Sequence, residues 1–343
     1  MPSLAAPAQR ILSPRVIGLG AAFVTVLIWT SFIVIARASA DPARGAALTP
    51  LDIALCRVLG ASLILLPWGL WLTRRDRARG LAGASLAGLS PLPLRATLSV
   101  GLFGGLLYAL LVYSGFSLAP AAHASVLMPG SLPLWTALLA WLFLRERITP
   151  ARVLGLALIV AGDLLVGGAS LLRALQGGEV WKGDLLFLCA GLCWACYSVL
   201  ARHFRLDAVR ATIAVTMVAL LTFVPVYGLL LATGLLSSRL ASAPWADLLF
   251  QAMFQGWGSV VISGITFTRM IQHFGPVRST MITALVPGLS ALGAVVFLGE
   301  PLHGYLLLGL ALVTLGIVFG VRKISSSAPE NVALNIDPAR VKA

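Results

Sequence analysis

Charged side chains are scarce in this sequence. They make up 11% of its 343 residues, while 59% of the residues are apolar, and a soluble domain ordinarily carries roughly 25% charge. A water-soluble fold could not bury so much apolar surface behind so few polar side chains. The composition therefore excludes an ordinary soluble domain and predicts that the lipid bilayer is the solvent of this chain.

Cysteine is also rare, and no cysteine lies in a loop. The four cysteines all fall inside apolar runs, at Cys56, Cys189, Cys193 and Cys196. This placement excludes the disulfide framework of a small secreted protein. The last three share a helix face, but no histidine or carboxylate accompanies them, so the sequence predicts no metal site.

Motifs for enzymatic and ATP-driven chemistry are missing as well. The sequence contains no GxxxxGK(S/T) phosphate loop, no HExxH, no GxSxG and no paired carboxylates. We therefore expect neither ATP drive, nor catalysis, nor a bound cofactor. The net charge of +13 would suggest nucleic acid binding in a soluble protein. Here the arginines stand in short loops between apolar runs, as membrane topology requires, so no nucleic acid partner is expected.

What the sequence does contain is a series of ten apolar runs. A helix that spans a hydrocarbon core of about 30 Å needs about 20 apolar residues. The runs cover residues 16–38, 51–73, 96–118, 122–144, 152–171, 183–202, 211–235, 247–271, 277–299 and 302–321. We therefore predict an all-α, polytopic membrane protein with ten transmembrane helices.

An internal repeat divides these runs into two sets. The stretch Ser131–Gly162 returns without a gap as Leu285–Gly316, 154 positions later, and this alignment pairs Pro133 with Pro287 and Glu146 with Glu300. The first run also has a copy, because Leu27–Ala38 matches Leu192–His203 at an offset of 165 and pairs Trp29 with Trp194. Such a repeat fixes the architecture. It predicts two five-helix repeats, at residues 16–171 and 183–322.

The basic residues predict the orientation of the helices. With the N-terminus inside, nineteen lysines and arginines fall on the inner side and five on the outer side, as the positive-inside rule requires. Because each repeat has five helices, an odd number, the two repeats enter the membrane in opposite directions. Inverted repeats are an architecture of secondary transporters. Glu146 and Glu300 then lie on opposite faces of the membrane.

The same orientation places both termini in the cytoplasm. We expect residues 1–15 to form a cytoplasmic N-terminal segment and the polar residues 323–343 to form a disordered cytoplasmic tail. Arginine outnumbers lysine by 22 to 3, which is typical of a GC-rich bacterial genome. The expected location is therefore the bacterial plasma (inner) membrane, with the lipid bilayer as the surrounding partner.

These features together resemble the drug/metabolite transporter superfamily, and within it the EamA-type permeases. The resemblance spans residues 16–322 and is carried by Trp29, Arg57, Tyr113-Ser114-Gly115, Pro133 with Glu146, Trp194, and Pro287 with Gly299-Glu300-Pro301. It implies a secondary transporter that moves a small organic metabolite, amino acid or drug across the plasma membrane by alternating access, with export favoured. One departure is Asp163, which stands where the family pattern is apolar.

Charged residues and prolines inside the spans are the first candidates for function. A charge at mid-bilayer costs about 2.5–3.5 kcal/mol, so Arg57 and Asp163 should face the interior. Arg57 would anchor a substrate charge, or alternatively snorkel to the interface. Asp163 would be a proton or charge partner. Pro133 and Pro287 each interrupt a span and are candidate hinges, or alternatively packing kinks.

Aromatic and amide side chains inside the spans are the remaining cavity candidates. They are Trp29, Tyr108, Trp194, Gln255, Trp257 and Ser259; ordinary packing is the alternative for each. For Glu146 and Glu300 we favour a structural role at the turns, and we expect His123 to be solvated in its loop.

The main rival to a transporter is a membrane-embedded enzyme or a non-transporting membrane scaffold. An enzyme would require an acid–base or metal cluster, and the sequence presents none. The substrate, the coupling ion, proton coupling and homodimer formation stay open at this point.

Overall fold

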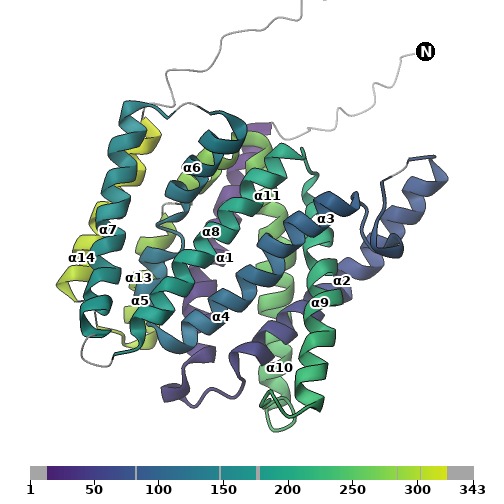
Figure 1. Cartoon of the computed structure of the whole chain (residues 1–343), viewed down its shortest axis with the longest axis horizontal. Coiled ribbons are helices and arrows are strands. Elements are labelled where there is room, and N and C mark those ends of the chain that lie inside the picture. Colours follow the sequence, from purple (N-terminus) through teal and green to yellow (C-terminus); the bar gives the residue numbers. More distant parts are fainter. Residues whose placement is uncertain are drawn as a thin grey trace, which may run out of the picture.

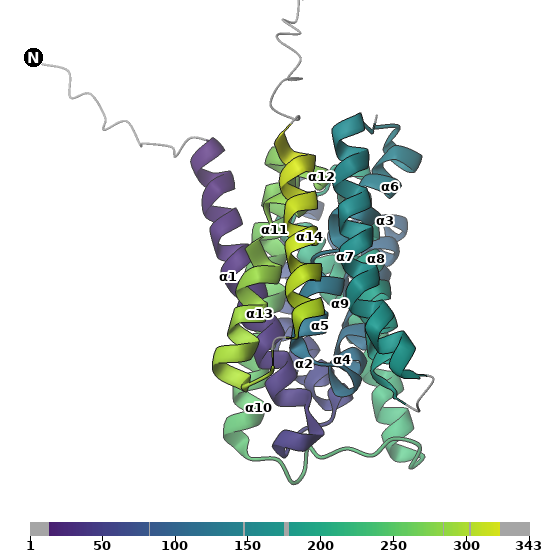
Figure 2. The same cartoon turned by 90° about the vertical axis from the view of Figure 1, so that its left-hand side faces the viewer.

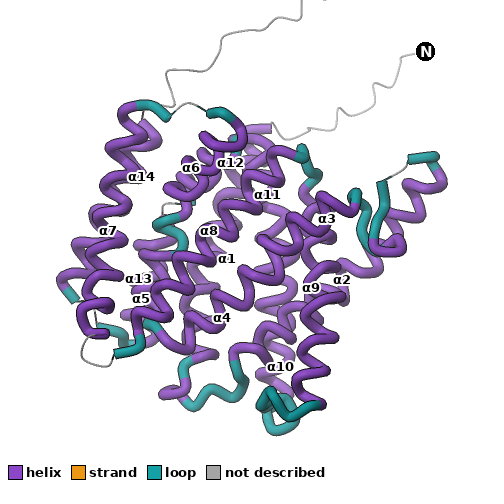
Figure 3. Tube along the Cα trace, viewed as in Figure 1, coloured by secondary structure: helices purple, strands orange, loops and turns teal. Residues whose placement is uncertain are grey.

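The computed structural model describes residues 14–81, 83–146, 148–174, 178–283, 285–301 and 303–322. Within these ranges all regular secondary structure is helical (Figure 3). Most of the N-terminal segment expected at 1–15, and the whole of the tail expected at 323–343, lie outside the described residues.

The first half of the chain contributes the helices α1 (Pro14–Ala40), α2 (Pro50–Ala78), α3 (Leu94–Gly101), α4 (Tyr108–Leu118), α5 (Ala121–Leu127), α6 (Leu132–Leu144) and α7 (Pro150–Ala174). The second half contributes α8 (Val180–His203), α9 (Ala208–Ala232), α10 (Trp245–Gln251), α11 (Ser263–Phe274), α12 (Pro276–Ile282), α13 (Leu285–Leu298) and α14 (Gly304–Arg322). Two π-helical stretches, η3 (Leu102–Leu107) and η4 (Ala252–Ile262), join α3 to α4 and α10 to α11.

The predicted spans are present, although four of them are composite. Nine helical stretches of the described chain are long and apolar enough to cross a membrane, and α14 adds a shorter apolar stretch, Gly304–Phe319. The third and eighth predicted spans each contain a π-helical stretch, and the fourth and ninth are each built from two short helices. The fold class is thereby confirmed as an all-α polytopic membrane protein.

The helices stand side by side in a single bundle (Figures 1 and 2). In Figure 1, α7 and α14 form one edge of the bundle, and α2 and α9 lie toward the other. We call the end at which α1 begins the N-terminal face, and the end at which α1 finishes the opposite face.

The start of α2 is fixed by a capping box. The Thr49 hydroxyl accepts a hydrogen bond from the Asp52 N–H (3.2 Å), and the Asp52 carboxylate accepts one from the Thr49 N–H (2.9 Å). Reciprocal bonds of this kind satisfy backbone donors that have no partner inside the helix. Asp52 also accepts from Ser238 (2.8 Å) and from the Arg239 N–H (2.9 Å), which tie the loop after α9 to α2. These contacts anchor the start of α2 and so fix the position of Arg57, which lies less than two turns further along the helix.

The fourth and ninth spans are broken near their middles. Four residues separate α5 from α6, and two separate α12 from α13. Pro133 and Pro287 lie in the first turn of α6 and α13, where no intrahelical N–H bond is lost. The interruption thus precedes each proline, which corrects our expectation that the proline itself breaks the span. At Gly130 a Cβ atom would lie 2.0 Å from the Val126 carbonyl oxygen, so the first break requires glycine.

The turns that follow α6 and α13 have the same backbone geometry. Arg145 and Gly299, which are equivalent in the repeat, are left-handed, with φ of 55° and 64°. The N–H of the next residue, Glu146 or Glu300, donates to the carbonyl oxygen six residues earlier, at 3.2 Å in both cases. A left-handed residue followed by such a bond is a common helix C-terminus. The sequence repeat is therefore also a repeat of local structure.

Helices α7 and α14 pack closely and run antiparallel (Figure 2). A Cβ atom on Gly162 would lie 2.7 Å from the Gly309 carbonyl oxygen, and one on Gly316 would lie 2.5 Å from that of Gly155. Since Gly155 corresponds to Gly309 and Gly162 to Gly316, exchanging the two helices converts one contact into the other. An approximate two-fold axis between the helices has this property, and the small residues allow the backbones to touch.

This contact predicts a position-dependent effect of adding one methyl group to α7. Gly162→Ala should destabilise the protein by about 1–3 kcal/mol, because the backbones must separate. Gly168→Ala is the matched control in the same helix, since nothing lies within 4 Å of its Cβ position, and alanine is the better helix former. Thermal unfolding of the purified protein in detergent measures both. Equal melting temperatures for the two variants would contradict the contact.

Candidate functional site

A small cavity of about 40 Å³ lies in the middle of the bundle. Residues of α2, η3, α4, α8, α9, η4 and α11 line it, and both π-helical stretches take part: Gly104 and Gly105 come from η3, and Ser259 and Val260 from η4. A π-helical turn is rare and is frequently found at functional sites. The cavity is thus built where two equivalent spans depart from α-helical geometry.

A second cavity, of about 20 Å³, adjoins the first, and four of its ten lining residues are aromatic. Its lining includes Trp29, Phe32, Tyr108 and Met128, and Trp194 lines both cavities. The residues that flank the two helix breaks also border it, with Leu132 next to Pro133 and Val286 next to Pro287. The two candidate hinges are therefore the sequence neighbours of residues that form this cavity wall.

Trp194 is the centre of an aromatic cluster. Its ring centroid lies 4.7 Å from that of Tyr108, 5.1 Å from Tyr197, and 5.6 Å from both Trp29 and Phe267. Tilted and edge-on contacts at these distances are favourable beyond the area they bury. Helices α1, α4, α8 and α11 are joined by this cluster, which gives the cavities rigid aromatic walls.

Arg57 lines the central cavity and is only 7% exposed. Its guanidinium carbon lies 5.7 Å from the centroid of the Phe32 ring. Across the described residues no carboxylate comes within ion-pair distance of Arg57, and its Nη1 atom has no hydrogen-bond partner. Arg57 thus faces the interior, where it is a buried cation without a counter-ion.

Asp163 is the other buried charge that the sequence singled out, and it lies elsewhere. It is 9% exposed on α7, with Oδ1 unpartnered, and it lines neither cavity. In the described part of the chain no ion pair joins it to Arg57. The two charges therefore do not form a pair in this conformation.

The polar candidates of the eighth span divide between the interior and the surface. Gln255 is fully buried and accepts a 2.9 Å hydrogen bond from the Tyr113 hydroxyl, and Ser259, one turn further, lines the central cavity. Trp257 lines neither cavity: it is 36% exposed, and its indole N–H donates to the Gly60 carbonyl oxygen at 3.0 Å. Trp257 was a cavity candidate because it lies inside a span, and in this conformation it packs against the backbone of α2 instead of lining either cavity.

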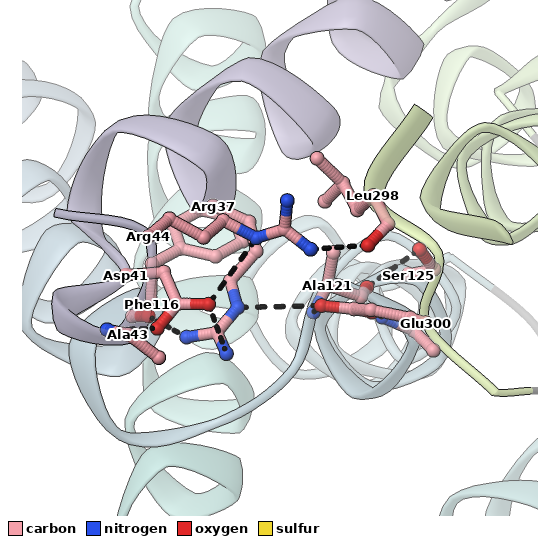
Figure 4. Close-up of polar contacts among 10 residues, drawn as sticks. Arg37, Asp41, Ala43, Arg44, Phe116, Ala121, Ser125, Leu298 and Glu300 are labelled. Atoms are coloured by element: carbon pink, nitrogen blue, oxygen red, sulfur yellow. Dashed lines mark hydrogen bonds and ion pairs between the residues drawn. The ribbon is translucent and has the colours of Figure 1, made fainter. Parts of the chain in front are cut away.

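An ionic network around Glu300 lies at the opposite face (Figure 4). Arg37, at the end of α1, contacts a Glu300 carboxylate oxygen at 3.3 Å, Asp41 at 3.0 Å and the Phe116 carbonyl oxygen at 2.8 Å. The Glu300 carboxylate also accepts from the N–H groups of Ala121 and Ala122, both at 3.1 Å. A carboxylate at a helix N-terminus is stabilised by its free N–H groups and dipole. Glu300 therefore joins α1, α5 and the α13–α14 turn.

The N-terminal face is open at the corresponding place. In the repeat Arg202 corresponds to Arg37 and Glu146 to Glu300, and both line a polar pocket of about 650 Å³. Within the described ranges no ion pair joins them. Tyr197 lines the central cavity and Thr268 lines this pocket, and their hydroxyls are 2.6 Å apart. This hydrogen bond lies between the two spaces.

One buried polar pair was not foreseen from the sequence. His123 is 4% exposed, and its Nδ1 lies 2.9 Å from a carboxylate oxygen of Asp184, which is 3% exposed. Our expectation of a solvated His123 was wrong, because α5 begins beneath the surface, against α8 and the ring of Tyr305. Asp184 inside an apolar run was the available signal. No group of three or more potential metal ligands comes together in the residues that the structure describes.

Together the helices and the cavity define a class, a polytopic all-α membrane protein with a central site between two unequal faces. The model of the EamA-like transporter family matches the sequence twice, over residues 16–168 and 181–322. The chain therefore belongs to the EamA-like transporter family and is a membrane transporter. The expected resemblance is confirmed.

Individual relatives agree with this assignment. An uncharacterized transporter of Bacillus subtilis, YyaM, is 26% identical over 64% of this chain and 69% of its own length. A probable amino-acid metabolite efflux pump of Salmonella typhimurium is 26% identical over 59% of this chain and 69% of its own length. A crystal structure that is 23% identical covers 89% of this chain and 96% of its own, with a TM-score of 0.54, and shows the fold alone.

The Tyr197–Thr268 bond predicts a barrier between the open pocket and the central cavity. We expect Tyr197→Phe to raise the reaction rate of a cysteine at Ser259 with an impermeant thiol reagent applied at the N-terminal face. Loss of a bond worth about 1 kcal/mol corresponds to roughly a fivefold increase. All the proteins that are compared carry the Ser259 cysteine in a background in which the four native cysteines are replaced by alanine. Thr233→Ala is the control, because it removes an exposed hydroxyl at the opposite face that bonds to carbonyl oxygens of its own helix. Equal rates in all three proteins would refute the barrier.

Proposed function

We propose that this protein is a secondary transporter that moves a small organic molecule by alternating access. The observation that carries this proposal is the difference between two equivalent Arg–Glu pairs. Arg37 and Glu300 are in contact at one face, whereas Arg202 and Glu146 line an open pocket at the other. A protein whose halves are related by an inverted repeat can exchange these two conditions by a rocking motion, and the site in the middle then opens to either side in turn.

The two halves act as inverted repeats in this proposal. Support comes from the reciprocal glycine contacts of α7 and α14, and from the repeated turn geometry at Glu146 and Glu300. The breaks before Pro133 and Pro287 supply the flexible points, since backbone groups freed inside a membrane are tolerated where they line a cavity. Each half thus bends close to the aromatic cavity wall.

The basic residues suggest which way the open pocket faces. Loops at the N-terminal face carry the excess of arginine, so we assign this face to the cytoplasm. The conformation is then open to the cytoplasm and closed to the outside, and a cytoplasmic substrate would bind from this side first. Export is the favoured direction, and the name of the Salmonella relative, a probable amino-acid metabolite efflux pump, supports it.

Transport itself can be tested with the purified protein in proteoliposomes. We expect counterflow of at least one labelled compound from a panel of amino acids, organic acids and other small metabolites, measured with and without a pH gradient. Asp163→Asn, assayed alongside, should abolish any response to the gradient if Asp163 carries the coupled proton. Normal gradient-driven transport by this variant would exclude a proton role for Asp163. No counterflow with any compound would favour a membrane-embedded enzyme or a scaffold.

The two glutamates provide a matched pair of substitutions for alternating access. Glu300→Gln weakens the closure of the opposite face, and loss of charge-assisted bonds worth roughly 1.5–3 kcal/mol should shift the population 10- to 100-fold toward opening there. Glu146→Gln, the same change at the equivalent position, should not open that face. Opening is measured as the distance between spin labels at Leu235 and Phe297, two exposed positions at the opposite face, by pulsed electron paramagnetic resonance. Identical distance distributions in both variants would contradict the proposed exchange.

A further inference from the structure

The partnerless polar atoms around the central cavity share one property, which is that all of them can donate a hydrogen bond. Among the described residues, Arg57 Nη1, Trp194 Nε1 and Gln255 Nε2 are donors only, and Thr216 and Ser259 carry hydroxyls without partners. Four of these five residues line the cavity, and Gln255 lies one turn from Ser259. Buried donors are costly when they are left unsatisfied. The site is thus prepared for a ligand that accepts hydrogen bonds.

The orientation of Gln255 is fixed by its neighbour. The Tyr113 hydroxyl donates to the amide oxygen at 2.9 Å, and both side chains are almost fully buried. An amide whose oxygen is already engaged presents its NH₂ group to any other partner. Gln255 therefore adds to the donor character of the site.

The charge of the residues that line the central cavity also favours a hydrogen-bond acceptor, and specifically an anionic one. Arg57 is the only charged residue among the described residues that line the central cavity. The ring of Phe32 supplies a cation–π contact, but an unpaired charge in a dry interior is still costly without a counter-ion. A single anionic group on the ligand would supply the missing counter-ion, whereas a doubly charged phosphate would exceed the one cation available.

The adjoining cavity defines the rest of the ligand. No charged side chain lines it in the described structure, and its walls are the rings of Trp29, Phe32, Tyr108 and Trp194 together with Met128 and other apolar groups. Trp194 belongs to both cavities, and Phe32 contacts Arg57. A ligand anchored at Arg57 would therefore extend into an apolar, aromatic space. A second charge at that end, such as an ammonium group, would find no carboxylate.

We infer that the substrate is a small organic monocarboxylate with an uncharged, apolar or aromatic body. Its carboxylate pairs with Arg57 and accepts hydrogen bonds from the neighbouring donors, and its body occupies the aromatic cavity. This assignment rests on the proposed transport function, since it describes the molecule bound at the central site. At about 40 and 20 Å³ the cavities hold only a few water molecules, so the substrate enters when the bundle opens.

Binding to the purified full-length protein tests this inference separately from transport. The probes are phenylacetate and indole-3-acetate, each compared by calorimetry with its neutral amide and with the corresponding zwitterion, phenylalanine or tryptophan. We expect each carboxylate to bind roughly 10- to 100-fold more tightly than its amide, as hydrogen bonds to a charged group imply. The zwitterions should also bind more weakly than the carboxylates.

Two variants of one helix separate recognition from structure. Arg57→Gln should remove the preference for the carboxylate while retaining amide binding, and Arg57→Lys should preserve part of it. Arg75→Gln is the matched control, because Arg75 is an exposed residue of α2 that makes a similar cation–π contact, 5.3 Å from the Trp71 ring centroid. It should leave the preference unchanged.

Three results would overturn the inference. They are equal affinity for acid and amide in the unmodified protein, failure of both carboxylates to bind, and an equal loss of acid and amide binding in Arg57→Gln. A protein that binds carboxylates in this manner but shows no counterflow would retain the site and refute the transport function. Counterflow of neutral or cationic compounds alone would support the transport function and refute the assignment of a monocarboxylate substrate.

Discussion

A charge inside a membrane protein has almost no water to bind, so its position depends on what partner the protein provides. Arg37 has several partners at the opposite face, among them Glu300, and there it holds α1, α5 and the α13–α14 turn together. Arg57 has no carboxylate at all within the described residues. The first arginine is held by ionic contacts at the opposite face, and the second is a buried cation without a counter-ion, which is the partner that the inferred carboxylate would supply.

The sequence repeat makes the two faces of the protein directly comparable. The residues that close the opposite face have equivalents at the N-terminal face, and the turns that carry the two glutamates share their backbone geometry. The chain therefore holds two equivalent Arg–Glu pairs, and among the described residues only Arg37 and Glu300 are in contact. This inequality between equivalent parts is the observation on which the proposed alternating access rests.

The sequence alone was sufficient to predict the membrane-spanning helices and to reveal the repeat. The length of each span, and the match of Ser131–Gly162 with Leu285–Gly316, can be read directly from the order of the residues. The sequence also identified Arg57, Trp194 and Ser259 as interior residues. It failed for His123, which is buried, and it did not anticipate the contact of Trp257 with α2; both depend on tertiary packing. A Cβ on Gly60 would lie 2.2 Å from the Ala252 carbonyl oxygen, so α2 touches the backbone of η4 directly. No local periodicity encodes such a crossing or the helical geometry that accompanies it.

The glycine contacts between α7 and α14 have a thermodynamic consequence. Exchanging the two helices converts the Gly162–Gly309 contact into the Gly316–Gly155 contact, so this interface is self-equivalent. Under the proposed alternating access, a self-equivalent interface would contribute nearly the same energy to both conformations. The energy difference between them would then depend on a few ionic contacts at the two faces, and the binding energy of one small molecule would be enough to reverse it.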